Sequence, residues 1–381
     1  MHYLYVGYYV DDKTFTEILD RKINNMSFAR QKFEYNIIRG FHEQLGDDVS
    51  FVSYVPTDGS LEIPNTSSIE DAIVTHIAIQ KSSVGSLVSA YKRFKNYLIS
   101  MGEEKLKGLR VLMYAVIPPF EQALLTLKKK YGIKIVTICS EVPELRRYGN
   151  SLPSRLKKKV LTHYNEQFDG YVLFSGAMKE VVRTENKPCL VMEGIAPDIR
   201  STPKAEKKNI VMYAGGLASD NNIPLLIECC QQVPELDEVW ICGVGPDEER
   251  IKEMADKDSK VKYFGRVPNE KVLEMESQAK VLVNFRNPNE KLTRYSFPSK
   301  ILEYIASGSM VMSTRLVGIP EEYFEYVIPV DITDRSAIIA CLVKVFSLQD
   351  KEYIDCCLEA QTFVCNKNYK AQTKRVIEFL V

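Results

Sequence analysis

Short runs of β-branched and aromatic residues alternate with longer helical patterns along nearly the whole chain. This alternation is typical of parallel sheets, because two parallel strands are joined by a crossover that is usually a helix. The strand-like runs of the first half are Leu4–Val10, Val49–Val55, Ile73–Ile79, Leu109–Tyr114, Ile133–Ile138 and Tyr171–Phe174. The helical patterns between them include Phe28–Gln44, Leu87–Ser100, Pro119–Lys130 and Leu152–Tyr164. The sequence therefore predicts a doubly wound α/β domain.

A second series of strands begins after the polar segment 199–208, which has the composition of a linker. Its strand-like runs are Ile210–Tyr213, Glu238–Cys242, Val261–Phe264, Val281–Asn284, Met310–Ser313 and Tyr326–Pro329. We predict two Rossmann-like domains, residues 1–200 and 201–365, and a final helix in 366–381 that packs back on the first domain. Ligands of such sheets bind beyond the carboxyl ends of the strands. Two domains that face each other across a cleft would place a donor on one side and an acceptor on the other.

Charge and cysteine usage narrow the class of protein. The chain has 50 Lys and Arg against 50 Asp and Glu, whereas proteins that bind nucleic acid need a surplus of positive charge. The nine cysteines form no C-x-x-C pair, which is typical of reduced thiols in a cytoplasmic protein. No apolar run approaches the ~20 residues of a membrane span. The basic segment 154–161 could bind anionic lipid and so hold the protein peripherally on the inner face of a membrane. The alternative is that this segment forms an ordinary solvated helix face.

The segment from Arg294 to Gly308 is the most informative stretch of the sequence. Its pattern predicts one helix, with Ser296 as N-cap, Pro298 in the first turn and Gly308 at the end. The backbone N–H groups at such a helix start bind anions, and Arg294 and Lys300 would add positive charge. Glu303, one turn further, could accept hydrogen bonds from a ribose diol. The alternative is an ordinary amphipathic helix with Glu303 on its solvent face.

Four motifs in order carry a family resemblance. They are Tyr213–Leu217, Ile241–Pro246, Phe264–Val267, and Phe297-x5-Glu303-x-x-Ala306-Ser307-Gly308 with the following Gly318-Ile319-Pro320-Glu321. Together they resemble the nucleotide-sugar-binding signature of family-four retaining glycosyltransferases (glycosyltransferase group 1), of the type that makes polysaccharides. The resemblance implies the GT-B fold, a nucleotide-sugar donor, and neither a cofactor nor a metal ion.

The resemblance also implies roles for individual residues. Gly215 and Gly216 would admit the donor diphosphate, Gly243, Gly245 and Arg266 would surround the base, and Glu303 would hold the ribose. The remaining donor-binding candidates are Tyr295, Ser296, Phe297, Pro298 and Ser299, and the catalytic candidates are Lys300, Arg294 and Glu141. For the glycines, tight turns after strands are the alternative explanation.

Three departures from the family pattern concern the sugar and the phosphates. Tyr295 stands where the family signature has its first glutamate. The loop 215–222 lacks the usual basic pair, so the phosphate charge would fall to Arg294, Lys300, Arg286 and Lys291. The stretch 139–144 lacks the usual His-Asp pair, and Glu141 could do part of its work.

Polar residues at the start of the helix that follows the first strand, where they would face the cleft, are candidates for binding the acceptor. They are Asn25, Ser27, Gln31 and Lys32, and an ordinary capped helix explains them equally well. Asp256-Lys257-Asp258 is read as a polar turn rather than a metal site, and no histidine lies at ligand spacing from a cysteine or carboxylate.

Together with these residues, the resemblance implies a retaining glycosyltransferase. It would move a hexose from a UDP-sugar to a glycan or lipid-linked glycan in bacterial polysaccharide biosynthesis, such as capsule or exopolysaccharide. Two alternatives remain: a nucleotide-sugar epimerase on the same scaffold, and a non-catalytic partner of another glycosyltransferase, which Tyr295 and the missing basic pair would suit.

Overall fold

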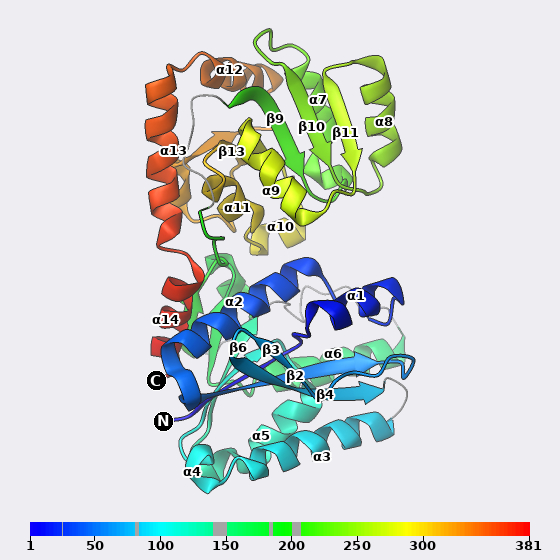
Figure 1. Cartoon of the computed structure of the whole chain (residues 1–381), viewed down its shortest axis with the longest axis vertical. Helices are drawn as coiled ribbons and strands as arrows, with labels where there is room; N and C mark the ends of the chain where they lie inside the picture. Colours follow the sequence, from blue (N-terminus) through cyan, green and yellow to red (C-terminus); the bar gives the residue numbers. More distant parts are fainter. Residues whose placement is uncertain (25, 81–83, 140–150, 183–185, 200–206) are drawn as a thin grey trace. The chain divides into compact units, whose positions relative to one another are not determined.

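The computed structural model describes residues 1–24, 26–80, 84–139, 151–182, 186–199 and 207–381 (Figure 1). The chain divides into two compact units. The N-terminal unit comprises residues 1–174, 178–192 and 369–381, and the C-terminal unit comprises 175–177 and 193–368. The chain thus passes into the C-terminal unit at Glu193, earlier than the predicted boundary at residue 201. Ser175 belongs to the C-terminal unit because its hydroxyl donates to the carbonyl of Tyr295 at 2.8 Å.

The N-terminal unit is built on a sheet with the strand order β3-β4-β2-β1-β5-β6-β7-β8. Its strands are β1 (Tyr3–Gly7), β2 (Val49–Thr57), β3 (Thr66–Ile69), β4 (Ala72–Gln80), β5 (Arg110–Tyr114), β6 (Lys134–Cys139), β7 (Gly170–Leu173) and β8 (Cys189–Val191). Its α-helices are α1 (Asp12–Asp20), α2 (Phe28–Leu45), α3 (Val84–Ser100), α4 (Glu103–Leu106), α5 (Pro118–Tyr131), α6 (Leu152–Asn165) and α14 (Tyr369–Leu380). All neighbouring strands are parallel except β3 and β4, which form an antiparallel hairpin.

The start of this unit differs from the prediction. The first strand ends at Gly7 instead of Val10, and helix α1, which the sequence reading lacks, follows it. Asp11 is the N-cap of α1, since its side chain accepts a hydrogen bond from the backbone of Thr14 at 2.9 Å. The apolar residues Phe15, Ile18 and Leu19 of α1 have helical spacing and pack into a buried cluster, so the signal was present but limited to nine residues.

The C-terminal unit has a six-stranded, wholly parallel sheet in the order β11-β10-β9-β12-β13-β14. The strands are β9 (Lys208–Ala214), β10 (Glu238–Cys242), β11 (Val261–Gly265), β12 (Ala279–Asn284), β13 (Met310–Thr314) and β14 (Val327–Val330). The helices are α7 (Ile223–Cys230), α8 (Glu248–Lys257), α9 (Asn269–Gln278), α10 (Lys291–Tyr295), α11 (Lys300–Ala306), α12 (Arg335–Phe346) and α13 (Asp350–Cys365).

Both faces of this second sheet are covered. In β9, Val211 and Tyr213 belong to the buried cluster that includes α7 and α12, whereas Met212 and Ala214 belong to the cluster that includes α9 and α11. Successive side chains of a strand point to opposite faces, so nearly all residues of a strand covered on both sides are apolar. This explains the continuous apolar runs of the sequence and confirms the α/β fold with two parallel-sheet domains.

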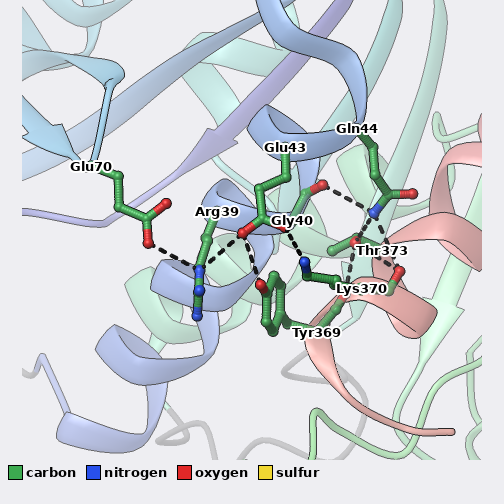
Figure 2. A network of polar contacts seen from close by, with 8 residues as sticks. All are labelled: Arg39, Gly40, Glu43, Gln44, Glu70, Tyr369, Lys370 and Thr373. Atoms are coloured by element: carbon green, nitrogen blue, oxygen red, sulfur yellow. Dashed lines mark hydrogen bonds and ion pairs between the residues drawn. The ribbon is translucent and has the colours of Figure 1, made fainter. Parts of the chain in front are cut away.

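The last helix, α14, packs against α2 of the N-terminal unit (Figure 2). Gly40 of α2 allows a close approach, because a Cβ atom there would lie 2.4 Å from the Thr373 hydroxyl. Gln44 donates to the same hydroxyl at 2.6 Å, and Tyr369 donates to the carboxylate of Glu43 at 2.8 Å. These contacts hold α14 to α2 directly after the chain re-enters this unit.

Across the described part of the chain, no helix combines the length and the apolar character that a membrane crossing requires.

Candidate active site

The strand order of the C-terminal unit locates its crevice. Successive connections run in opposite directions from β9 and β12, which are adjacent in the sheet. In open sheets of this order, ligands bind outside the carboxyl ends of the strands at this switch point. The loops after the two strands are tied together here: Asn222 donates to the carbonyl of Phe285 at 2.8 Å, and the Asn287 amide donates to the carbonyl of Asp220 at 2.7 Å.

Gly243 and Gly245 serve the packing of loops around this crevice. Gly243 has a φ of +138°, and a Cβ atom on it would lie 1.8 Å from the carbonyl oxygen of Gly215. A Cβ atom on Gly245 would lie 2.6 Å from the carbonyl oxygen of Leu217. Both glycines therefore let the loop after β10 pack directly on the loop after β9, as the tight-turn alternative expects.

Gly215, Gly216 and Arg266 lie at the same edge of the sheet. Gly216 is exposed, and no atom lies within 4 Å of the place where its Cβ would be, so its backbone can be approached closely. At Gly215 a Cβ atom would meet the hydroxyl of Tyr213 at 2.6 Å. Arg266 is exposed just after β11. A contact of these residues with the donor remains a prediction.

The predicted helix over the most informative segment is in fact two short helices, α10 and α11. Ser296 is therefore not an N-cap: it lies at the C-terminal end of α10, and α11 begins only at Lys300. Pro298 disfavours helical geometry at Phe297, which packs against Tyr323 with ring centroids 5.1 Å apart. Gly308, as predicted, follows the end of α11, with a φ of +72°.

The break leaves residues 296–299 as a non-helical segment between α10 and α11, supported from both sides. A Cβ atom on Gly318, in the loop after β13, would lie 2.2 Å from the carbonyl oxygen of Ser296. The Ser175 hydroxyl donates to the carbonyl of Tyr295 on the other side. Ser299 is exposed, whereas Phe297 and Pro298 are buried and support the segment from below. Only part of this predicted donor-binding run can therefore touch a ligand through side chains.

Lys300 and Glu303 lie together with a third residue, Glu276 of α9. The ammonium group of Lys300 lies 3.4 Å from Oε1 of Glu276 and also pairs with Oε1 of Glu303. Glu276 is fully buried. Burial by itself would lower the pKa of Lys300, but the carboxylates of Glu276 and Glu303 raise it above its ordinary value. Lys300 is therefore a cation whose charge is matched inside the protein.

This arrangement differs from the alternative of an ordinary helix with Glu303 on its solvent face. The roles of Lys300 at a phosphate and of Glu303 at the ribose remain predictions. The side chain of Glu303 is only 12% exposed and is directed to Lys300. Glu276 was missed by the sequence analysis. Its signal is a charged residue on the apolar stripe of a helix, because Val272 and Met275 of α9 are buried beside it.

The exposed positive charge near the crevice comes from other residues. Arg294 is exposed at the end of α10, 5.9 Å from the ring centroid of Tyr295, and Lys291 is exposed at the start of that helix. Arg286 follows β12 at the switch point. Arg286 is half-buried and directly follows Phe285, whose carbonyl accepts a hydrogen bond from Asn222 of the loop after β9.

The N-terminal unit has its own switch point, between β1 and β5. A buried glutamate, Glu34 of α2, lies beneath the end of β1: its Oε2 accepts from the Tyr8 amide at 2.7 Å and from the Tyr5 hydroxyl at 3.0 Å. Gly7 provides the space, because a Cβ atom there would lie 1.9 Å from Glu34. Directly after the neighbouring strand β5, Ala115 has a φ of +65°, an uncommon conformation for a residue with a side chain. The sequence analysis missed these residues.

Two of the predicted acceptor residues, Ser27 and Gln31, serve the local structure. Ser27 is the N-cap of α2, since its hydroxyl accepts from the Arg30 amide at 3.3 Å, and Gln31 is buried and donates to the carbonyl of Val10. Lys32 is exposed. Asn25, like the catalytic candidate Glu141, lies outside the described residues. The capped-helix alternative explains Ser27 and Gln31, and a contact with the acceptor remains a prediction.

The comparison with known proteins concerns the crevice of the C-terminal unit. Residues 195–327 match the family model of glycosyl transferases group 1. This range contains the loops after β9 and β12. It also contains Lys300, Glu303 and Glu276, which we call the Lys300 cluster. The chain is a glycosyltransferase. The matched range covers most of the C-terminal unit and none of the described N-terminal sheet. No curated protein sequence matches the chain.

Solved structures support the fold of the whole glycosyltransferase. A trehalose-6-phosphate protein from E. coli bound with UDP-2-fluoro glucose has a TM-score of 0.68 at 10% identity, covering 99% of this chain and 98% of that one. A sucrose-phosphate synthase from Thermosynechococcus elongatus has a TM-score of 0.64 at 12% identity, covering 100% and 98%. The lipopolysaccharide outer core galactosyltransferase WaaB, in its apo form, has a TM-score of 0.61 at 13% identity, covering 98% and 97%. At these identities the likeness shows the GT-B fold alone.

The pH dependence of stability provides a test of the buried glutamate in the N-terminal unit. Burial raises the pKa of Glu34 to about 7, although the hydrogen bonds from Tyr8 and Tyr5 oppose the shift. The folded state then holds the proton more tightly than the unfolded chain. The stability that this group adds is present below the ordinary pKa near 4.5 and is lost as the pH rises through 7.

We therefore expect Glu34→Gln to gain stability relative to the parent protein as the pH rises from 5 to 8. The expected gain in the free energy of unfolding is on the order of 3 kcal/mol, from the usual value of about 1.4 kcal/mol per pKa unit. Urea unfolding followed by circular dichroism at several pH values measures it. Glu121, another buried glutamate of this unit with a raised pKa, is present in both proteins, so its contribution cancels. Parallel stability curves would contradict the assignment.

Proposed function

We propose that this glycosyltransferase moves a hexose from a UDP-sugar to a hydroxyl group of a glycan or lipid-linked glycan. The transfer would retain the anomeric configuration of the sugar. It would take place in the cytoplasm of a bacterium that makes a capsule or exopolysaccharide. The observation that carries the proposal is that the switch-point crevice and the Lys300 cluster lie inside the range matched by the family model. A nucleoside diphosphate is the ligand whose chemistry suits an exposed glycine backbone after β9 together with arginines in the segment after β12.

The donor would be held by groups from several loops. The Gly216 backbone, Arg286 and Arg294 would receive the diphosphate, and their positive charge would stabilise the leaving group as the bond to the sugar breaks. Glu303, held in place by Lys300, would accept hydrogen bonds from the ribose hydroxyls. In this proposal Lys300 is a positioning residue rather than a direct phosphate ligand, because its charge is already matched by two carboxylates.

Two of the structural neighbours are in keeping with this donor and acceptor. One is bound with a UDP-sugar analogue, and another is a galactosyltransferase of the lipopolysaccharide outer core. Retention would follow if the acceptor hydroxyl attacks the face of the sugar that the diphosphate leaves, with the diphosphate receiving the proton. This route needs no side-chain base, and we propose that it also needs no metal ion.

Calorimetry with UDP, GDP and ADP tests the donor. We expect UDP to bind with a micromolar dissociation constant that is the same in EDTA and in magnesium chloride, and GDP and ADP to bind at least tenfold more weakly. Preferential binding of GDP or ADP would contradict the assignment of the base. A dissociation constant that falls strongly with magnesium would contradict metal independence.

The same titrations separate the two alternatives. An epimerase would convert a UDP-sugar to a second UDP-sugar in the absence of an acceptor, which nucleotide-sugar chromatography detects. A non-catalytic partner would bind none of the three nucleotides. The proposed function instead requires release of UDP that depends on an added glycan or lipid-linked glycan, with the anomeric configuration of the product read by NMR.

A further inference from the structure

Helix α6 of the N-terminal unit presents an apolar stripe to solvent. Leu152 is 80% exposed, Leu156 61% and Val160 39%. These residues are four positions apart and therefore lie along one face of the helix. In a doubly wound fold the apolar face of a helix normally covers the sheet. In α6 the only fully buried residue is Asn165, whose carbonyl accepts from the Tyr171 hydroxyl at 2.6 Å.

Positive charge surrounds this stripe. At the helical spacing of about 100° per residue, Arg155 and Lys159 lie on one side of the stripe and Lys157 lies on the other. All three residues are exposed. The segment from Ser151 to Asn165 contains no Asp or Glu, so the charge of this surface has one sign. The chain as a whole is neutral, and this helix is therefore a local concentration of charge.

We propose that α6 docks on an anionic lipid bilayer. Leu152, Leu156 and Val160 would enter the boundary between headgroups and acyl chains, and the flanking cations would contact lipid phosphates. An exposed apolar stripe with basic residues on its borders is the pattern of helices that lie in a membrane interface. The partner follows from charge complementarity, because the phosphates of an anionic bilayer can contact the basic side chains on both sides of the stripe at the same time.

An internal control exists in helix α3. Leu87 is 52% exposed, which is close to the exposure of Leu156, but the segment 84–91 around it contains no charged residue. An exposed leucine without neighbouring cations should contribute little to binding an anionic surface. Leu87→Ser is therefore the matched control for Leu156→Ser.

Sedimentation of the full chain with vesicles tests the proposal. We expect binding to vesicles of phosphatidylglycerol and phosphatidylcholine, and none to vesicles of phosphatidylcholine alone. Leu156→Ser should weaken binding at least fivefold, and Leu87→Ser should leave it unchanged. The pair Lys157→Gln and Lys159→Gln should weaken it about 30-fold, since each charge near the surface contributes roughly a factor of five.

Three results would overturn the proposal: no binding to anionic vesicles, equal binding to both kinds of vesicle, or equal losses in Leu156→Ser and Leu87→Ser. Circular dichroism melting of each variant shows that it is folded. Vesicle binding needs neither a donor nor an acceptor, so its outcome is independent of the calorimetry that tests the proposed function.

Discussion

Replacing Lys300 by alanine should lower the free energy of unfolding of the C-terminal unit by about 3 kcal/mol. The reason is Glu276, which is fully buried and has its charge matched by Lys300 at 3.4 Å. Removing one member of a buried ion pair costs roughly 3 to 5 kcal/mol, because a buried charge loses its partner. The lower end of that range applies here, since the Lys300 side chain is 34% exposed and water can reach part of it.

Fluorescence of the only tryptophan allows the unit to be observed by itself. Trp240 lies in β10 of the C-terminal unit and is largely buried, so its emission during urea unfolding reports on this unit. The double variant Lys300→Met and Glu276→Gln should recover most of the loss, because both charges are removed together. Equal losses in the single and double variants would show that the lysine acts through packing and not through charge.

Glu303→Ala should raise the dissociation constant of UDP by about 10- to 100-fold. This change corresponds to about 1.4 to 2.7 kcal/mol, which is close to the contribution of one hydrogen bond between the ribose and a charged acceptor. The stability of the unit should change by less than about 1 kcal/mol, because Lys300 keeps Glu276 as its partner. Glu303→Ala thus affects binding without unfolding, whereas Lys300→Ala affects stability first.

The matched controls for this prediction are two further glutamate variants. Glu303→Gln keeps the shape of the side chain and a hydrogen-bond acceptor, so its loss of affinity should be smaller. Glu253→Ala removes an exposed glutamate of α8 and should leave the affinity unchanged. An unaltered dissociation constant in Glu303→Ala would remove Glu303 from the donor site while leaving the fold assignment intact.

The sequence predicted the sheets well because burial on both faces leaves a strong local signal. The predicted strand Glu238–Cys242 has the same bounds in the structure, and Met310–Ser313 differs by one residue. The hairpin strand β3 is short and polar, so the local pattern did not show it. Helix α1 has an apolar face but is only nine residues long, and the sequence analysis missed it.

The segment around Ser296 shows where local rules compete. Ser296 and Pro298 both fit the start of a helix in a single sequence, yet the chain continues as a non-helical segment to Ser299. Burial of Phe297 against Tyr323, together with the effect of Pro298 on the residue before it, decides the outcome. Tyr323 is a tertiary neighbour, and its contribution cannot be read from the segment itself.

The sequence by itself determined the two parallel-sheet domains, the glycine-rich loops after the strands and the range that matches the family model, because periodicity and turn chemistry are local properties. Only the tertiary structure decided the electrostatics of the site. Glu276 and Lys300 lie on different helices, 24 residues apart, and Glu34 reaches the Tyr8 amide across 26 residues. The packing of helices on a sheet determines which residues become partners at such separations. Burial at those contacts then determines which charged side chains are paired inside the protein and which charged side chains can still bind a ligand.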